Sequence, residues 1–310
     1  MSSEPTFSNL QAELEKTINL LQRSGLGQRV SVPADPLTSL LEQCQAVSAE
    51  IASRSRLRMV HHFACTGGTL VSKCIAALPN IILASEIDPL SRLGAATAQD
   101  KPLFAPTDLI GGILNNPRNV SDAAITQIFK RSVAASLSAL SSQGLTLVVR
   151  DHPHSHFCTS TEISARPTVR EMLSDEVDVL SVVTVRHPLD SFLSLEHNNW
   201  IHFSPRTLDE YCRRYHLFLD RHAPLPLVKY EDFQDDPEKS LKEICKHLSI
   251  DYSPLALDTF WVIALSGDSG RKSRVISKRA RRDINDKVLE EIGKSTQYEK
   301  LCLRLGYGSF

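Results

Sequence analysis

Residues 57–78 read LRMVHHFACTGGTLVSKCIAAL, and the turn inside this segment decides the fold. Residues 59–64 predict a short apolar strand, residues 66–69 a tight turn of small residues, and residues 70–78 a helix with apolar positions at helical spacing. The first N–H groups of a helix lack internal partners and carry partial positive charge, so this turn is a candidate anion site. Its glycines let the main chain approach a phosphate without a Cβ, and its threonines add hydroxyl donors.

The turn by itself also fits an ordinary strand-to-helix connection in an α/β protein. It does not match the GxxxxGK[ST] loop of nucleoside triphosphatases, because the first lysine is Lys73, a full turn into the helix. Motifs further along the chain are therefore needed to choose between an anion site and a plain connection.

Composition narrows the class of protein. The chain has 310 residues, of which 42% are hydrophobic and 23% charged, as in a globular protein with one large α/β domain or two small ones. The net charge of −1 does not favour binding to nucleic acid or to an anionic membrane. The seven cysteines are scattered without a CxxC pair, so we expect a reduced, cytoplasmic protein with neither disulfides nor a metal site. We expect no secretory signal and no membrane span.

The N-terminal part, residues 1–56, predicts a helical extension, because apolar residues recur at helical spacing from Phe7 to Leu21. A cap on the main domain is favoured over a dimer helix. Further along, residues 91–120 lack periodicity and contain several prolines, which is typical of a lid or substrate wall.

Two carboxylates follow the second predicted strand, residues 80–85. Ligands of open α/β sheets bind at the carboxyl ends of strands, so Glu86 and Asp88 lie where a catalytic carboxylate could be. A role in capping the next turn explains either residue equally well.

Three alternating histidines follow the predicted strand 145–149 in the sequence RDHPHSH, residues 150–156. Metal binding is the least favoured interpretation, because alternate residues cannot all face one ion unless the loop curls. The histidines could instead bond to loop carbonyls, or one could act as a general base, since histidine titrates near neutrality. Arg150 and Asp151 could then supply charge and orientation beside that base.

The strand predicted over residues 179–185 leads into RHPLDSFLS, which places Arg186 at the strand exit and Ser194 two helical turns later. A guanidinium with a hydroxyl is a phosphate-binding pair, although a salt bridge at the helix start is an alternative. Tyr230, after a later strand, could contact a base or belong to the core. The sequence SGDSGRKSR, residues 266–274, suits either a mobile lid over an anion or a solvated basic loop.

In this order, the TGGT turn, RDHxH, RHPxDxxxS, KYEDF and GDSGRKS resemble the motifs of the sulfotransferase family, enzymes that use 3′-phosphoadenosine 5′-phosphosulfate (PAPS). The resemblance covers about residues 57–285. It implies a three-layer α/β/α domain over residues 57–310, with a central parallel sheet of P-loop type and with residues 91–142 and 197–222 on the substrate side. It also implies sulfuryl transfer to a hydroxyl of a glycan or small alcohol.

The resemblance further implies which residues bind the nucleotide. They are Thr66, Gly67, Gly68, Thr69 and Leu70 in the 5′-phosphosulfate loop, Arg186 and Ser194 at the 3′-phosphate, Tyr230 near the adenine, and Arg271, Lys272 and Ser273 in the C-terminal loop.

The family's catalytic base maps onto His152, with His154 as a near competitor, and members with a glutamate base place it at Glu86. One departure is that Cys65 replaces the family's cation before the loop, and Arg150 is the preferred substitute over Lys73, His61 or His62. This departure keeps a non-catalytic nucleotide-binding module open as an alternative, beside a small-molecule kinase of P-loop type.

Overall fold

The computed structural model describes Lys16 and residues 56–93, 108–114, 118–266, 273–278 and 280–308. The predicted N-terminal extension, apart from Lys16 and Arg56, therefore lies outside the described residues, and so do Arg271 and Lys272.

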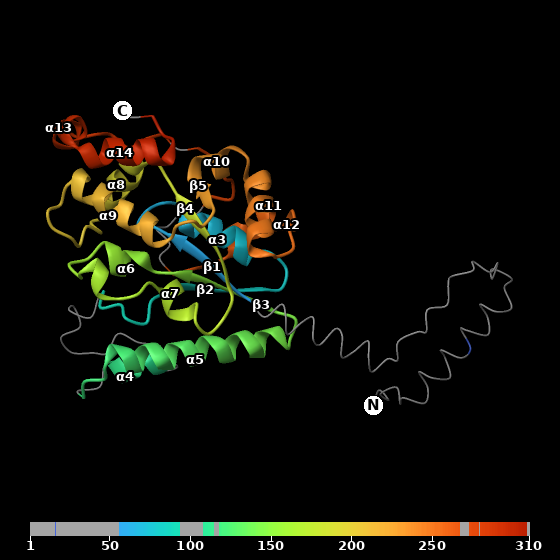
Figure 1. The fold of residues 1–310 in the computed structure, drawn as a ribbon. Helices are drawn as coiled ribbons and strands as arrows, with labels where there is room; N and C mark the ends of the chain where they lie inside the picture. The colour runs from blue at the N-terminus through green and yellow to red at the C-terminus, as the bar shows by residue number, and fades with distance from the viewer. Residues whose placement is uncertain are drawn as a thin grey trace. The chain divides into compact units, whose positions relative to one another are not determined.

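A five-stranded, all-parallel sheet forms the centre of the domain (Figure 1), in the order β2-β3-β1-β4-β5. The strands are β1 (Leu57–His62), β2 (Ile81–Ile87), β3 (Thr146–Asp151), β4 (Val179–Val185) and β5 (Leu227–Lys229). Helices cover both faces, which confirms the predicted three-layer α/β/α fold.

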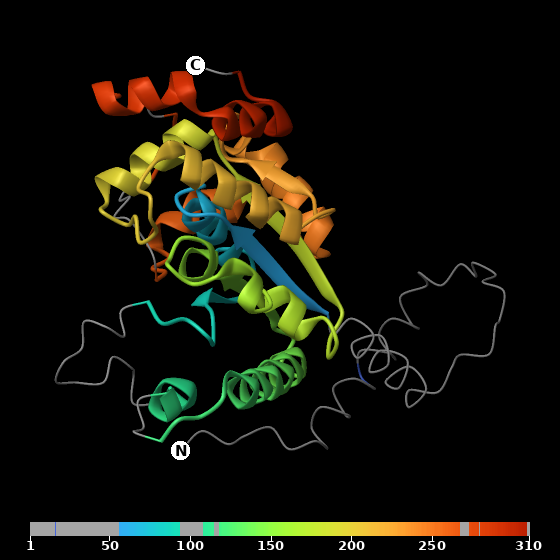
Figure 2. The same ribbon diagram turned by 60° about the vertical axis from the view of Figure 1, so that its left-hand side comes forward.

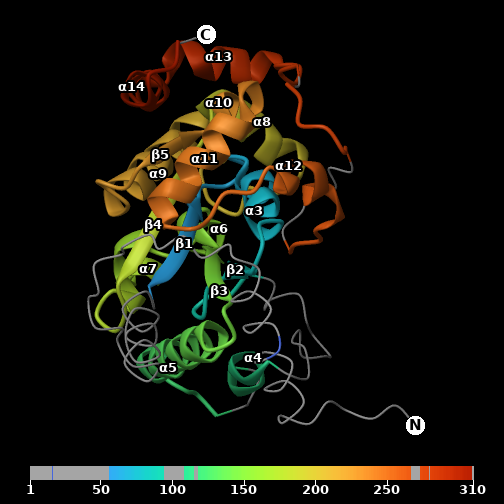
Figure 3. The ribbon, with the colours of Figure 1, turned by 90° about the vertical axis from the view of Figure 1, so that its right-hand side faces the viewer.

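One face of the sheet packs against α3 (Gly68–Ala76), α11 (Pro237–Leu248) and α12 (Leu255–Thr259), which lie together in Figures 1 and 3. Side chains alternate along a strand, so Val60, Val148 and Val182 point into this layer. The intervening residues, such as Met59 and Val149, point to the other face.

That second face is covered by a larger set of helices, and the yellow-green members of this set lie beside the blue strand β1 in Figure 2. They are α5 (Asp122–Ser141), α6 (Pro153–Phe157), α7 (Val169–Leu173), α8 (Pro188–His197) and α9 (Leu208–Arg221). The remaining helices are α4 (Leu109–Leu114), α10 (Tyr230–Asp235), α13 (Asp286–Lys294) and α14 (Thr296–Leu305), with short 3₁₀ turns at Ile163–Ala165 and Phe260–Val262. Among the described helices, none combines the length and apolarity that crossing a bilayer requires.

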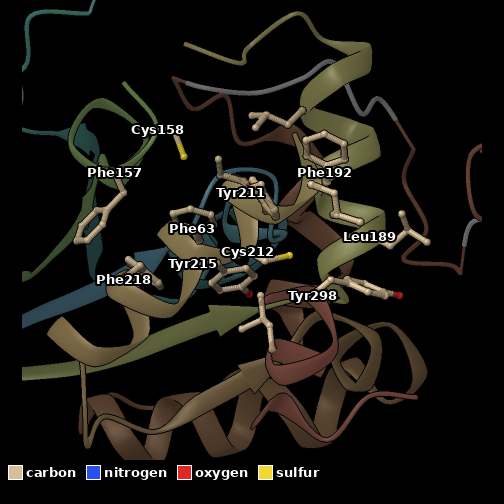
Figure 4. Packing of buried hydrophobic residues seen from close by; sticks show 14 of the residues in the cluster. Phe63, Phe157, Cys158, Leu189, Phe192, Tyr211, Cys212, Tyr215, Phe218 and Tyr298 are labelled. Atoms are coloured by element: carbon tan, nitrogen blue, oxygen red, sulfur yellow. The ribbon is translucent and has the colours of Figure 1, made fainter. Parts of the chain in front are cut away.

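An aromatic cluster fixes the ends of β1 and β4 (Figure 4). Phe63, the first residue after β1, stacks on Tyr215 with ring centroids 4.6 Å apart. The hydroxyl of Tyr211 donates to the Ala64 carbonyl at 3.0 Å, and the backbone N–H of Arg186 donates to Tyr215 Oη at 3.2 Å. The core thereby holds the TGGT turn and the Arg186 loop at the same edge of the sheet.

Candidate active site

The carboxyl ends of β1, β2, β3 and β4 open into one cavity of about 570 Å³. This size falls within the range of ligand pockets. Its wall includes twelve of the predicted site residues: Thr66, Gly67, Gly68, Thr69, Leu70, Glu86, Arg150, His152, His154, Arg186, Ser194 and Tyr230.

The TGGT turn begins α3, and its glycines are required by close packing. Gly67 has φ +86°, and a Cβ there would lie 2.1 Å from the ring of Tyr230. A Cβ on Gly68 would lie 2.5 Å from Cγ of His62. Gly67 is the N-cap residue of α3, and no side chain there accepts a hydrogen bond from the first N–H groups of the helix. The helix start therefore presents backbone N–H groups to the cavity.

The two threonines of the turn differ in what their hydroxyls contact. Thr66 is fully buried, and its hydroxyl donates to the Phe63 carbonyl at 2.8 Å, so it shapes the turn from within. The hydroxyl of Thr69, by contrast, accepts a 3.0 Å hydrogen bond from Nη2 of Arg150.

Arg186 and Ser194 come together as the sequence predicted. Nη1 of Arg186 donates to Ser194 Oγ at 3.3 Å and to the Cys65 carbonyl at 3.4 Å. The guanidinium carbon lies 5.0 Å from the ring centre of Tyr230, a cation–π distance. A cation, a hydroxyl and an aromatic ring thus share one end of the cavity.

Arg150 is a cation at the start of α3, where it donates to Thr69. Its guanidinium is almost fully buried, pairs with the Glu86 carboxylate, and donates to Ser85 Oγ at 2.9 Å. Burial raises the pKa of Cys65 to about 12 despite the nearby Arg186, so that thiol stays neutral and offers no charge of its own.

His152 faces the same carboxylate, with its Nε2 2.9 Å from Oε2 of Glu86. Burial alone would raise the pKa of Glu86, but the hydrogen bond from His152 and the charges of His62 and Arg150 outweigh it and lower that pKa to about 2. Glu86 is therefore ionised at neutral pH. An ionised Glu86 accepts a proton-bearing Nε2, which leaves Nδ1 of a neutral His152 with the lone pair.

Glu86 itself has an unusual backbone. The sequence placed it after the second strand, but it lies inside β2, at an irregularity in the pairing with β3 between Ala84 and Ile87. Its φ of +59° is rare for a residue with a side chain. This bulge turns the carboxylate toward Arg150 and His152.

The other carboxylate at this strand end, Asp88, has a structural role. Both its oxygens accept hydrogen bonds of 2.7 Å from Arg166, and Ser155 donates to it as well. Of the two residues that the sequence could not separate, only Glu86 lines the cavity.

The three alternating histidines contact three different partners. His152 faces Glu86, Nε2 of His154 lies 3.0 Å from the Trp200 carbonyl, and Nε2 of His156 lies 2.9 Å from the Ile163 carbonyl. Their ring nitrogens therefore point to three separate partners and not to one common point. Burial lowers the pKa of His154 to about 4, so it is a weaker base than an ordinary imidazole.

The resemblance also placed Ser273 at the nucleotide. It is exposed, its hydroxyl donates to the Val275 carbonyl at 2.8 Å, and it is absent from the cavity wall among the described residues. Two aromatic residues that were not predicted as site residues, Phe260 and Trp261, also line the cavity. Arg282, from the basic segment after the loop, lies there too. The Phe-Trp pair just before the Gly/Ser-rich segment was the only signal for this wall.

Three solved structures similar to this chain are sulfotransferases. The sulfotransferase domain of the Synechococcus PCC 7002 olefin synthase is 18% identical, with 81% of this chain and 94% of that chain covered and a TM-score of 0.43. Mouse sulfotransferase SULT7A1, solved in complex with PAP, is 15% identical, with 82% and 91% covered and a TM-score of 0.40. Sulfotransferase STF1 from Mycobacterium tuberculosis H37Rv is 12% identical, with 71% and 74% covered and a TM-score of 0.35.

No family model matches the chain, and no curated protein matches it. The likeness to the three structures is loose, so the functional proposal depends on the cavity itself.

Proposed function

We propose that this protein is a sulfotransferase that moves a sulfuryl group from PAPS to an acceptor hydroxyl. The observation that carries the proposal is that two anion-binding groups from separate strand ends line one cavity. One is the TGGT turn at the start of α3, and the other is Arg186 with Ser194. A nucleotide that is charged at both its 3′ and 5′ positions fits this arrangement.

The residues present suit such a nucleotide in three respects. The start of α3, with no side-chain cap at Gly67, supplies N–H donors for a 5′-phosphosulfate. Arg186 and Ser194 supply a guanidinium and a hydroxyl for a 3′-phosphate. Tyr230 lies between the two groups, beside Gly67 and under Arg186, where a base can contact its ring.

PAPS, when bound, supplies an activated sulfuryl group with a nucleotide phosphate as its leaving group. Transfer of this kind needs charge stabilisation and positioning more than covalent chemistry from the protein. Arg150 lies beside Thr69 and is held by Glu86, so we assign to it the charge stabilisation that Cys65 cannot give.

His152 is the proposed general base. The Glu86 carboxylate fixes the Nε2 proton and orients the ring, and Nδ1 then accepts the proton of the acceptor hydroxyl. His154 is less suited to this role, because it is held by the Trp200 carbonyl and its pKa is lowered to about 4.

The acceptor would bind at the part of the cavity wall near His154. This part of the wall is formed by His197, Asn198, Trp200 and His202. Imidazole, amide and indole groups suit a polar acceptor with an apolar face, such as a sugar or small alcohol. We also propose a cytoplasmic location, supported by buried cysteines that remain thiols at positions 158, 212, 245 and 302.

The test is a transfer screen with PAPS labelled in its sulfuryl group against glycans, lipids, phenols and alcohols. Label in an acceptor, lost in His152→Ala, supports the proposal. Calorimetry with adenosine 3′,5′-bisphosphate runs beside it. Tight binding without transfer to any acceptor would favour the non-catalytic module, and magnesium-dependent phosphate release from ATP would favour a kinase.

A further inference from the structure

A second polar cluster lies on the sheet face opposite the cavity, and the proposed function does not use it. It consists of His61 in β1, Asp151 in β3 and His222 at the end of α9. Val60 pairs with Arg150 across β1 and β3, so His61 and Asp151 are the next neighbours in the same register. All three residues are buried, with exposed fractions of 0%, 2% and 2%.

The three side chains each direct a metal-ligand type of atom toward one point, and these atoms lie within 4.8 Å of one another. The imidazole of His222 has a fixed tautomer, because its Nδ1–H donates to the Phe218 carbonyl at 2.8 Å. Its Nε2 must therefore carry the lone pair. Among the described residues, that buried Nε2 has no hydrogen-bond partner.

Asp151 adds a second acceptor of the same kind. Its Oδ2 lies 2.6 Å from Nδ1 of His61, whereas its buried Oδ1 has no hydrogen-bond partner within the described part of the chain. Two buried acceptors in one cluster that lack a donor among the described residues cost free energy, since each has lost its hydration. A positive group between them would remove that cost.

The imidazole of His61 also has an outer hydrogen-bond partner, as metal-binding histidines do. Its Nε2 lies 3.1 Å from Ser181 Oγ, so the hydroxyl can accept the Nε2 proton while Nδ1 faces Asp151. Metal-bound histidines usually donate their second ring N–H to such an outer partner. Both histidines of this cluster have one, in Ser181 and in the Phe218 carbonyl.

We propose that His61, Asp151 and His222 bind a divalent transition-metal ion, best matched by Zn²⁺. Two imidazole nitrogens and one carboxylate oxygen form a mixed ligand set that suits zinc, whereas calcium and magnesium prefer oxygen atoms throughout. Asp88 and Glu86 add negative charge near Asp151, and Arg170 near His61 opposes it. Because the site is fully buried, the ion has a structural role and does not contact substrate.

The site would act on the cavity through β3. Asp151 lies between Arg150 and His152, which face the cavity, so an ion that holds Asp151 also holds the end of this strand. The sequence predicts no metal site, because it has no cysteine pair and its local histidine cluster has alternate spacing. The three ligands proposed here come from positions 61, 151 and 222 and share no local motif.

The experiment uses the full chain, treated with a chelator, incubated with Zn²⁺ and desalted. Metal content is measured by mass spectrometry, and the melting temperature is measured with and without Zn²⁺. We expect about one ion per chain and a higher melting temperature with zinc, as mass action requires when only the folded state binds. His222→Gln should abolish uptake, and Ser181→Ala should weaken affinity by about 10- to 100-fold.

Two histidine variants outside the cluster are matched controls. His216→Gln, on the same helix as His222, and His202→Gln, in the cavity wall, should both retain the ion. If His222→Gln does not fold, the absorption spectrum of the wild-type chain loaded with Co²⁺ tests which ligand atoms bind the ion. Visible d–d bands without a thiolate charge-transfer band would support nitrogen and oxygen ligands.

Three results would overturn the proposal. One is no stoichiometric uptake by the wild-type chain, and another is equal uptake by His222→Gln and the controls. The third is a melting temperature that depends on pH but not on zinc, which would show that a shared proton fills the space between Asp151 and His222. None of these results bears on PAPS binding, so the two proposals can fail separately.

Discussion

Replacing Arg186 with alanine should weaken the binding of adenosine 3′,5′-bisphosphate by about 2 kcal/mol or more, which is about 30-fold. Within the described residues, the guanidinium makes two long hydrogen bonds, 3.3 Å to Ser194 and 3.4 Å to the Cys65 carbonyl. Little is therefore lost when it turns toward an anion. A charge-assisted hydrogen bond contributes about 1.5–3 kcal/mol, and this sets the expected loss.

The assay is isothermal titration with two ligands, adenosine 3′,5′-bisphosphate and adenosine 5′-monophosphate. If Arg186 contacts the 3′-phosphate, Arg186→Ala should weaken the binding of adenosine 3′,5′-bisphosphate and leave the binding of adenosine 5′-monophosphate unchanged. Arg186→Lys should fall between the wild type and the alanine variant, because it keeps the charge but loses the planar fork.

A loss below about 0.5 kcal/mol, the size of an exposed ion pair, would refute the assignment. So would an equal loss for both ligands, since that would place Arg186 elsewhere on the nucleotide. Arg131→Ala is the matched control: this arginine is exposed on α5, pairs with Glu176, and should not affect either ligand.

Three further predictions concern catalysis, pH and the turn. His152→Ala should lower turnover by at least about 100-fold with bisphosphate binding unchanged, and lost binding with normal turnover would reject its role as the base. Because the folded-state pKa of Glu86 is depressed from 4.5 to about 2, its contribution to stability is present above pH 4.5 and is lost as pH falls toward 2. In urea unfolding, Glu86→Gln should therefore have a lower free energy of unfolding than the wild type at neutral pH. The gap between the two free energies should become smaller in acid. Gly67→Ala should lower the free energy of unfolding by about 2 kcal/mol or more, from its positive φ and the contact with Tyr230. Gly144→Ala, also at positive φ but in open space, should cost only about 1 kcal/mol.

The fold could be predicted because its elements have strong local signals. The apolar run 179–185 is β4 at its observed bounds, and the proline-led amphipathic segment is α11, Pro237–Leu248. Strand ends were less predictable: Arg150 belongs to β3 and Glu86 to β2, because main-chain pairing continues through polar residues.

The site could be predicted only where its residues lie next to a recognisable strand exit. Arg186 lies just before α8 and Ser194 lies within it, eight residues later, so their contact follows from spacing. Glu86 and Asp88 could not be told apart, because the arginine that separates their roles is Arg166, far along the chain. Phe260 and Trp261 reach the cavity through tertiary packing, which the adjacent Phe-Trp pair in the sequence does not reveal by itself.

The alternation of side chains along the end of β3 has an evolutionary consequence. Arg150 and His152 serve one face of the sheet while Asp151 serves the other. A single-residue insertion or deletion upstream in this strand would exchange the two faces, withdrawing the cation and the histidine together and exposing the aspartate in their place. Such a change would disrupt the cavity residues and the proposed ion site together. We therefore expect this segment to tolerate substitutions more readily than insertions or deletions.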